Sequence, residues 1–430
     1  PESQDIYGGE VIGERYSIES SRLRYMGGTT NHWSGWCRPL DEAQFQARDD
    51  ISYSGWPISK ADLDPYLASA LDILDIDENA IWEPPTQSNF GNQSLSNYGL
   101  KEIYWQWSTP TRFREKYYED LVENSNIDVL LNHSFIDVET GDNGSITSAI
   151  FRNTENETTT RIEGRIFVLA CGGIENARLL LYLNQSKGTQ WGNQASLLGK
   201  HFMEHPHVSV GDFVVIEPNY NHETFENERR RFFTFTAPYQ REQNVLACSL
   251  RMTIASGDQR DSLVESLAMH STLPHVPQWQ AGSLIAVTES LPVDENYVRL
   301  SEDRDDLGIP RSELHWHVQP LDIETIRVMI RQFATFMLDT NLGRCRLEEW
   351  VLNETPPDRI FSGNHHMGTT KMSSDADNGV VDADCRLYGT ENLFVAGSSV
   401  FPTSGHANPT LTIVQLALRL SSHIQRELST

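Results

Sequence analysis

Apolar residues recur every three or four positions in several stretches of the chain, and this spacing predicts amphipathic helices. The clearest stretch runs from Ser59 to Leu74: Ser59 is a helix N-cap, Asp62 stands three positions on, and apolar residues then repeat at helical spacing. Further helices are expected over residues 111–124, after Asn176, over 321–342 and from Leu411 to Ile424.

Short runs of β-branched and apolar residues predict strands. They lie at 128–131, 135–139, 146–153, 165–170 and 393–396, and in a second group at 213–216, 232–236, 246–252, 284–288, 297–300 and 314–318. In the second group, alternating or apolar runs are separated by polar turns. This pattern predicts one large antiparallel sheet with one solvent-exposed face. Helices, buried strands and this sheet together predict an α/β (α+β) fold.

Glycine marks three corners of the predicted fold. Gly172 and Gly173 end the 165–170 strand before a helix, and Gly397 with Ser398 ends the 393–396 strand. A strand that ends in glycine before a helix lets backbone N–H groups approach an anionic ligand. Gly27 and Gly28 allow the backbone to pass close to a flat ligand. These corners predict a nucleotide-type cofactor.

Composition restricts the class of protein. The 430 residues suggest two or three domains, and 34 Lys+Arg against 60 Asp+Glu give a net charge of −26. This charge disfavours binding to nucleic acid or to an anionic membrane. No apolar run is long enough to span a bilayer and no signal peptide is visible at the start, so a cytoplasmic location is expected.

Neither cysteine nor histidine spacing predicts a metal site. The five cysteines are scattered without a C-x-x-C pair, which indicates neither a disulfide framework nor zinc. Six of the histidines between residues 205 and 317 fit no zinc pattern and are expected to be hydrogen-bonded packing residues: His205, His207, His270, His275, His315 and His317. We therefore expect no metal.

The segment from Phe361 to Ile424 carries a specific resemblance. It contains a polar turn with Asn364, His365 and His366, the Gly397 corner, and a second polar turn that ends in Asn408, Pro409 and Thr410. It resembles the C-terminal signature of the glucose–methanol–choline (GMC) family of FAD-dependent oxidoreductases, most closely the branch with pyranose 2-oxidase and sugar dehydrogenases. The resemblance implies FAD as cofactor, His365 as general base and Asn408 as the residue that holds the substrate oxygen.

A second family signature lies at residues 27–33. The resemblance places Gly27, Gly28, Thr29, Thr30, Asn31, His32 and Trp33 along the flavin, and Val129 close to the adenosine end. The two other glycine corners, with Pro409 and Thr410, complete the expected cofactor-binding set. In pyranose 2-oxidase the histidine that matches His32 is bonded covalently to the flavin, and here such a bond stays open. Without the resemblance, His32 and Trp33 read as packed core residues.

The glycine-rich G-x-G-x-x-G unit of a Rossmann-like FAD domain is missing from the sequence. The opening residues resemble the segment that comes after that unit in the family, so the unit is absent here, supplied by another chain, or lost. We expect residues 1–430 alone to bind FAD weakly or not at all. The family implies a discontinuous FAD-binding domain over 1–50, 110–204 and 360–430, and a substrate domain over 51–109 and 205–359 with a lid-like loop.

The resemblance implies oxidation of a sugar, polyol or other secondary alcohol by hydride transfer to flavin N5. A neutral imidazole such as that of His365 suits removal of the hydroxyl proton. Two alternatives stay open: a catalytically silent homologue that acts as a binding or subunit protein, and a lyase on the same fold. Oxidase and dehydrogenase activity are not separated, and an electron-acceptor protein and a homo-oligomer stay open as partners.

Overall fold

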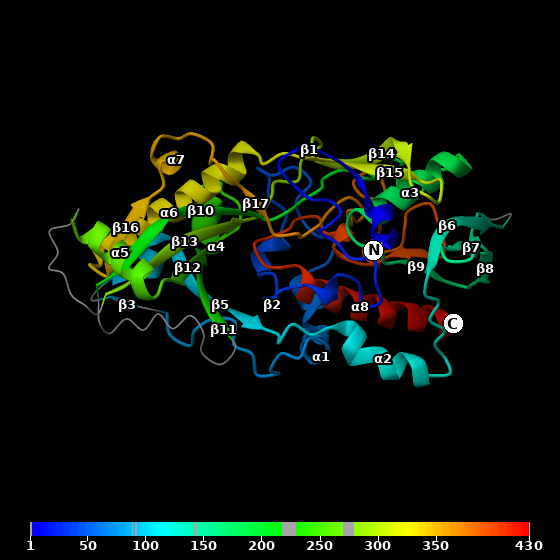
Figure 1. Ribbon diagram of the computed structural model, residues 1–430, viewed down its shortest axis with the longest axis horizontal. Helices are drawn as coiled ribbons and strands as arrows, with labels where there is room; N and C mark the ends of the chain where they lie inside the picture. The colour runs from blue at the N-terminus through cyan, green and yellow to red at the C-terminus, as the bar shows by residue number, and fades with distance from the viewer. Residues whose placement is uncertain are drawn as a thin grey trace.

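The computed structural model describes residues 2–87, 89–90, 93–141, 144–216, 229–269 and 279–429. Figure 1 shows an elongated molecule with a large sheet in one lobe and both chain ends in the other. His270 and His275 lie outside the described residues.

The large sheet has the strand order β16-β10-β13-β12-β11-β5-β2, and β17 also pairs with β10. Its strands are β2 (Trp36–Cys37), β5 (Leu100–Trp107), β10 (Pro206–Val215), β11 (Arg229–Phe235), β12 (Cys248–Ile254), β13 (Gln280–Thr288), β16 (Gly343–Leu347) and β17 (Phe361–Ser362). Neighbouring strands are antiparallel. The side chains of one face pack against α6 (Pro320–Asp339) in a continuous apolar core. Shorter helices complete this lobe: α4 (Ala237–Glu242), α5 (Gly257–Met269) and α7 (Glu349–Leu352).

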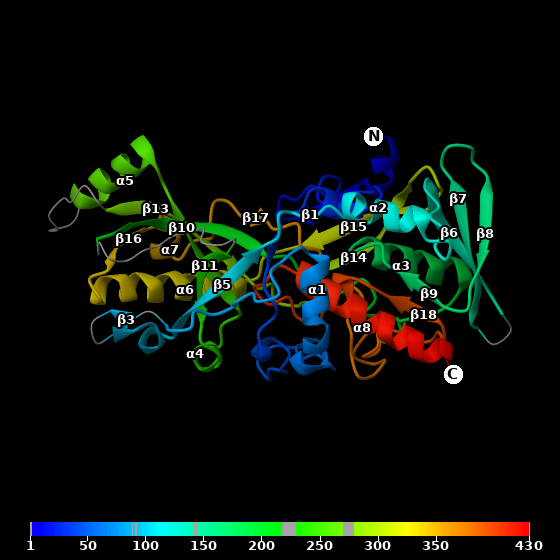
Figure 2. The ribbon, with the colours of Figure 1, turned by 90° about the horizontal axis from the view of Figure 1, so that it is seen from below.

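The second lobe is built around two short parallel strands, β9 (Phe167–Leu169) and β18 (Leu393–Val395). Helices α3 (Glu175–Lys187) and α8 (Thr410–Ser429) lie close to this pair, and Figure 2 shows α8 running along the lower side of the lobe. A meander of β6 (His133–Thr140), β7 (Ile146–Asn153) and β8 (Thr159–Glu163) lies at its outer end. Helices α1 (Leu67–Ile73) and α2 (Phe113–Glu123) and the strand pair β3 (Asn89–Phe90) and β4 (Gln93–Ser94) come from the connecting segments.

The predicted single antiparallel sheet is wrong in one respect. Strands β14 (Tyr297–Arg304) and β15 (Pro310–Trp316) form a separate sheet with β1 (Gly9–Gly13), and β1 runs parallel to β15. Trp316 and Leu314 are buried there with Ile18 and Phe202. The alternating pattern correctly predicts strands, but the same pattern allows more than one set of strand partners.

Two local predictions also need correction. The helix expected from Ser59 to Leu74 starts with the predicted capping box but forms two 3-10 turns, and the α-helix begins only at Leu67. Pro65 explains this break, because it lacks an N–H and disfavours helical backbone at the residue before it. Residues 128–131 form no strand, and Val129, Leu130 and Leu131 are exposed.

Candidate cofactor and active site

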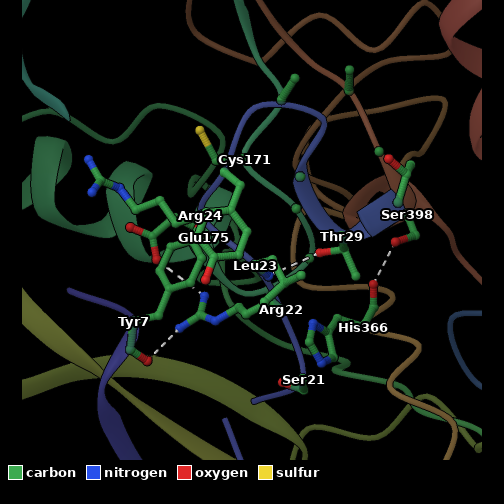
Figure 3. A pocket seen from close by; sticks show the side chains of 18 of the residues that line it. Tyr7, Ser21, Arg22, Leu23, Arg24, Thr29, Cys171, Glu175, His366 and Ser398 are labelled. Atoms are coloured by element: carbon green, nitrogen blue, oxygen red, sulfur yellow. Dashed lines mark hydrogen bonds and ion pairs between the residues drawn. The ribbon is translucent and has the colours of Figure 1, made fainter. Parts of the chain in front are cut away.

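A cavity of about 1130 Å³ lies in the lobe that holds the chain ends, and glycines of all three predicted corners line it. Figure 3 labels a residue next to each of these corners: Thr29, Cys171 and Ser398. Most of the predicted cofactor and catalytic residues line it: Gly28, Thr29, Thr30, His32, Trp33, Gly172, Gly173, His365, Gly397, Ser398, Asn408, Pro409 and Thr410. These residues are far apart in sequence, so it is the fold that gathers them at one cavity.

The glycines at the corners keep space open. Gly28, Gly172 and Gly397 have φ values of 55°, 93° and 112°, in the left-handed region that favours glycine. A Cβ built at any of the three would meet nothing within 4 Å, although all three line the cavity. A side chain there would occupy space that is now free beside the backbone. The residues thus fit a ligand that approaches the main chain closely, as a dinucleotide cofactor does.

Asn176, in the first turn of α3, joins two of the corners. Its amide oxygen accepts a hydrogen bond from the Cys171 N–H at 2.8 Å. Its Nδ2 donates to the Ala396 carbonyl at 3.1 Å and to the Ser399 hydroxyl at 2.9 Å. Because Asn176 is fully buried, these bonds fix the Gly172 corner against the Gly397 corner.

The turn that contains His365 and His366 is tied to the same corners. The Ser398 hydroxyl donates to the His366 carbonyl at 2.6 Å, as Figure 3 shows, and the Thr369 hydroxyl donates to the Gly173 carbonyl at 2.6 Å. A Cβ on Gly173 would lie 2.3 Å from the His366 carbonyl oxygen, so glycine is needed for this close approach. The turn with His365 and His366 is therefore held at a fixed position relative to the cavity.

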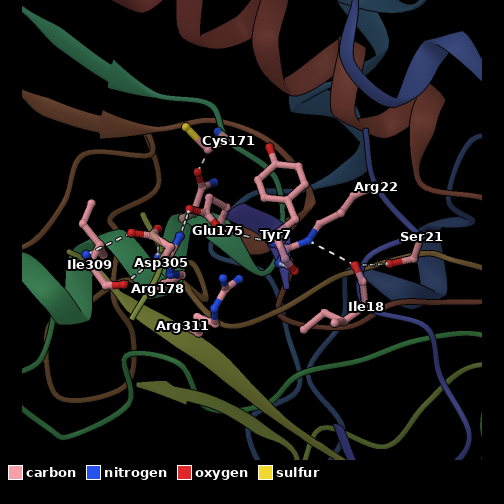
Figure 4. Close-up of polar contacts among 12 residues, drawn as sticks. Tyr7, Ile18, Ser21, Arg22, Cys171, Glu175, Arg178, Asp305, Ile309 and Arg311 are labelled. Atoms are coloured by element: carbon pink, nitrogen blue, oxygen red, sulfur yellow. Dashed lines mark hydrogen bonds and ion pairs between the residues drawn. The ribbon is translucent and has the colours of Figure 1, made fainter. Parts of the chain in front are cut away.

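A buried ionic network borders the cavity (Figure 4). Glu175 lies 3.2 Å from Arg22 and 2.7 Å from Arg178, and Arg178 also pairs with Asp305. Arg22 Nη2 donates to the Tyr7 carbonyl at 3.1 Å. The network joins the N-terminal segment, α3 and the turn between β14 and β15. Sequence reasoning missed it, since its members have no common motif.

His365 forms a pair with His205 on the wall of the site. The two Nδ1 atoms are 2.9 Å apart, and His205 Nε2 is 2.8 Å from the Gly405 carbonyl oxygen. Burial lowers the pKa of His205 to about 4. Burial, together with the neighbouring His205 and His207, lowers the pKa of His365 well below its usual value. Both rings are therefore neutral near pH 7.

The hydrogen bonds assign the proton on each ring. A carbonyl oxygen only accepts, so His205 Nε2 carries the proton of that ring and His205 Nδ1 is an acceptor. His365 Nδ1 must then donate to it. The lone pair of His365 is consequently on Nε2, the nitrogen that does not face His205.

The Glu204 side chain positions the same turn by accepting hydrogen bonds from backbone N–H groups. Its carboxylate oxygens accept the N–H groups of His365 at 2.9 Å, Gly363 at 3.2 Å and His205 at 2.7 Å. Burial raises the pKa of Glu204 to about 7, although these N–H groups lower it. Glu204 and His205 were not predicted as site residues, and the only signal in the sequence is a carboxylate beside a histidine just before a strand.

The remaining polar residues of the two turns each have a polar contact within the protein. Asn408 Nδ2 donates to the Trp36 carbonyl at 3.2 Å, which orients the amide beside the cavity. His366 is hydrogen-bonded to the Tyr16 hydroxyl. His406 is buried 4.0 Å from Asp41, and burial lowers its pKa to about 3.

Three predicted cofactor residues do not line the cavity. Gly27 lies against Arg114, where a Cβ would be 2.8 Å from the Arg114 backbone nitrogen. Asn31 donates through Nδ2 to the carbonyls of Met26 and Gly28, so it stabilises the turn. Val129 is 43% exposed, whereas its neighbours Leu130 and Leu131 do line the cavity.

The described residues contain no group of three or more histidine, cysteine, aspartate or glutamate side chains arranged to hold a metal ion. Within the same residues, every helix is too short or too polar to cross a bilayer.

The fold is that of FAD-dependent oxidoreductases. An FAD-dependent oxidoreductase from Chaetomium thermophilum superposes with a TM-score of 0.59 at 14% sequence identity, over 95% of this chain and 87% of that one. Residues 292–417 match the family model for GMC oxidoreductases. The resemblance found in the sequence is thus confirmed, and so is the α/β fold class.

Two relatives with named activities are similar to this chain in sequence. The 2-methyl-1,2-propanediol dehydrogenase of Mycolicibacterium austroafricanum is 24% identical over 97% of this chain and 84% of its own length. The fructose dehydrogenase large subunit of Gluconobacter japonicus is 26% identical over 68% of this chain, which spans 52% of that subunit. The oxidoreductase class predicted from the sequence is confirmed by this match to a family of alcohol and sugar oxidoreductases.

Proposed function

We propose that the protein is an FAD-dependent oxidoreductase that oxidises an alcohol group of a sugar, polyol or other secondary alcohol. The single observation that carries this proposal is the position of His365, a neutral imidazole with a fixed tautomer on the wall of the glycine-lined cavity. The family match supports it independently.

The residues around the cavity would hold the cofactor. The Gly172 and Gly397 corners offer backbone N–H groups and free space, and Gly28, Thr29 and Thr30 offer a further stretch of close main chain. Bound FAD supplies the two-electron oxidising group of the reaction. His32 and Trp33 line the same cavity, so a covalent bond between His32 and the flavin belongs to the proposal's tests.

His365 would remove the hydroxyl proton of the alcohol through Nε2. The donor bond from its Nδ1 to His205 holds this tautomer and stabilises the imidazolium that forms, because His205 Nδ1 accepts that bond. Asn408 would hold the substrate oxygen with its amide, which the Trp36 carbonyl already orients. Both residues touch the reacting hydroxyl in this proposal.

One domain would bind the cofactor and the other would bind the substrate. We infer a cofactor domain over residues 1–50, 110–204 and 360–430 and a substrate domain over 51–109 and 205–359. The cavity is lined mostly by residues of the first set, with Asp305, Leu307 and Ile309 from the second, and the large sheet is built mostly from the second set; both support this division. The sheet formed by β1, β14 and β15 joins the two sets.

The visible spectrum of the purified protein with FAD tests the cofactor. Saturable binding of added FAD, followed through the flavin absorbance, is expected, and absorbance that stays with the protein after denaturation would indicate a covalent bond for mapping at His32. Oxidation of 2-methyl-1,2-propanediol and D-fructose, coupled to an artificial electron acceptor, then tests the activity. A protein that binds no flavin would favour the catalytically silent alternative. Bound flavin that no alcohol reduces would favour a lyase.

A further inference from the structure

Two arginines lie on the face of the large sheet that does not pack against α6. Phe233 of β11 pairs in register with Leu250 of β12, and both are in the core with α6. Side chains alternate along a strand, so Arg251 and Phe232 face the other way. Arg230, two positions before Phe232, shares that face and lies in register with Trp105 of β5.

Neither guanidinium has a carboxylate partner in the described part of the chain. The Nε atoms of Arg230 and Arg251 are buried without a hydrogen-bond partner. Burial and the charge of Arg251 lower the pKa of Arg230 to about 10, and burial lowers that of Arg251. By contrast Arg231, on the same strand, lies 3.2 Å from Glu102. Among the residues that the structure describes, no carboxylate is paired with these two neighbouring cations, although the sequence has 60 acidic residues.

Such an arrangement costs free energy in the unliganded protein. A partly buried cation without a counter-charge is poorly solvated, and two like charges side by side repel each other. An oxyanion placed between them removes both costs, and the guanidinium fork binds carboxylate or phosphate oxygens in pairs.

The same face leads to the proposed base. Arg251 is close enough to His207 to lower its pKa, and the His207 ring centroid is 6.3 Å from that of His365. Aromatic rings lie on the same face: Trp105 stacks on Phe232 at 4.7 Å, and Arg230 lies over the Trp36 ring at 5.9 Å. Trp105 is 3% exposed, and its Nε1 has no partner either.

Arg230 and Arg251 are not among the residues that line the glycine-walled cavity, so they are not positioned for the phosphates of a cofactor in that cavity. Trp105 and Phe232 are buried in a small apolar cluster, and the partly buried Trp36 packs against it. Apolar surroundings with a few convergent polar groups are typical of a site for a small molecule. The arginines thus lie outside this cavity, on the sheet face near His207.

We propose that Arg230 and Arg251 bind an anionic group of the substrate, and that the substrate is a hydroxylated compound with a carboxylate or phosphate, such as a sugar acid. This inference rests on the proposed oxidation of alcohols. It assigns the carbon skeleton to the aromatic face, the oxyanion to the arginines and the reacting hydroxyl to His365.

The test compares matched pairs of compounds on the full chain with FAD. D-glucuronate and D-glucose 6-phosphate are each compared with D-glucose, and binding is followed by tryptophan fluorescence, since Trp36 and Trp105 lie on this face. We expect at least one anion to bind on the order of 10-fold or more tightly than D-glucose. Arg230→Gln and Arg251→Gln should each abolish this preference, and the response of the two anions separates carboxylate from phosphate.

Arg229→Gln is the matched control, because it removes the same charge from the same strand but on the opposite face. It should leave the preference unchanged. Arg251→Lys keeps the charge without the fork and should retain part of the preference, which guards against a variant that fails to fold. Equal binding of the anions and D-glucose, or no saturable anion binding, would overturn the proposal. Oxidation of neutral alcohols would then leave the proposed function standing, whereas anion binding without any alcohol oxidation would remove only the proposed function.

Discussion

His205 and His365 face each other through their Nδ1 atoms at 2.9 Å, and His205 is anchored by the Gly405 carbonyl on its other nitrogen. The Gly405 carbonyl oxygen thereby determines the tautomer of His205, and His205 in turn determines the tautomer of His365. The consequence is a lone pair on His365 Nε2 before any substrate binds.

This relationship is testable by nuclear magnetic resonance. In protein labelled with 15N-histidine we expect the His365 signals to report the Nδ1–H tautomer. His205→Leu removes the acceptor and should produce a mixture of tautomers, with kcat reduced more than KM. His205→Asn offers an amide oxygen in place of Nδ1 and should restore part of both. A His365 ring that is already Nε2–H in the wild-type protein would contradict the assignment.

Glu204→Gln should loosen the turn that contains His365. The amide has one acceptor oxygen for three N–H groups, so we expect a loss of about 1–3 kcal/mol in the free energy of unfolding together with reduced kcat. Asp322→Asn is the control, since Asp322 also accepts two backbone N–H groups but begins α6. The control should lose similar stability and keep its activity. Equal losses of activity in both variants would mean that Glu204 acts only through stability.

Gly172→Ala should reduce FAD binding beyond its effect on folding. The positive φ costs about 1–2 kcal/mol for alanine, and the new methyl group would enter space beside the cavity. Gly188→Ala is matched, because Gly188 has a φ of 66° and open space but ends α3 away from the cavity. Titration with FAD, alongside denaturant unfolding, should separate the two variants. A similar loss of FAD affinity in both would argue against the cradle.

The buried histidines predict how stability depends on pH. Burial lowers the folded-state pKa of six of them: His201, His205, His207, His365, His366 and His406. The unfolded chain therefore binds more protons than the folded chain below about pH 6.5. For these histidines, the free energy of unfolding consequently decreases as the pH falls from 6.5 towards 4.

Three buried carboxyls act in the opposite direction. Burial raises the pKa of Glu204 and Asp322 to about 7 and also raises that of Glu289, so their contribution is lost as pH rises from about 4 towards 7. The effect of the six histidines on stability is expected to exceed that of the three carboxyls. We therefore expect the midpoint temperature of thermal unfolding to decrease as the pH is lowered from 6.5 to 5. A midpoint that rises over this interval would contradict the burial of the histidines as neutral rings.

The sequence predicts local features of this site better than its long-range contacts. The glycine corners could be predicted because a positive φ and a strand end are properties of a few adjacent residues, as at Gly172 and Gly397. Glu204 and His205 could not, since they meet His365 across 160 positions of the chain. Arg230 and Arg251 were missed for a different reason: their significance is the absence of a carboxylate nearby, which only the three-dimensional arrangement reveals.

Partner choice among strands was the other limit. The runs at 297–300 and 314–318 carry the pattern of the large sheet, yet they pair with β1 from the start of the chain. Pattern determines which face of a strand is apolar, whereas packing against Trp316 and Phe202 determines which sheet the strand joins.

The central claim is that His365 is the base in oxidation of an alcohol. Its most direct test is anaerobic stopped-flow mixing of the FAD-loaded protein with 2-methyl-1,2-propanediol, D-fructose and D-glucuronate, following the visible flavin band. The account predicts that at least one of them bleaches the band, and that His365→Ala retains flavin but slows bleaching on the order of 10²–10⁴-fold. His423→Ala, on α8, should match the wild-type rate. Bleaching at a near-normal rate in His365→Ala would contradict the account.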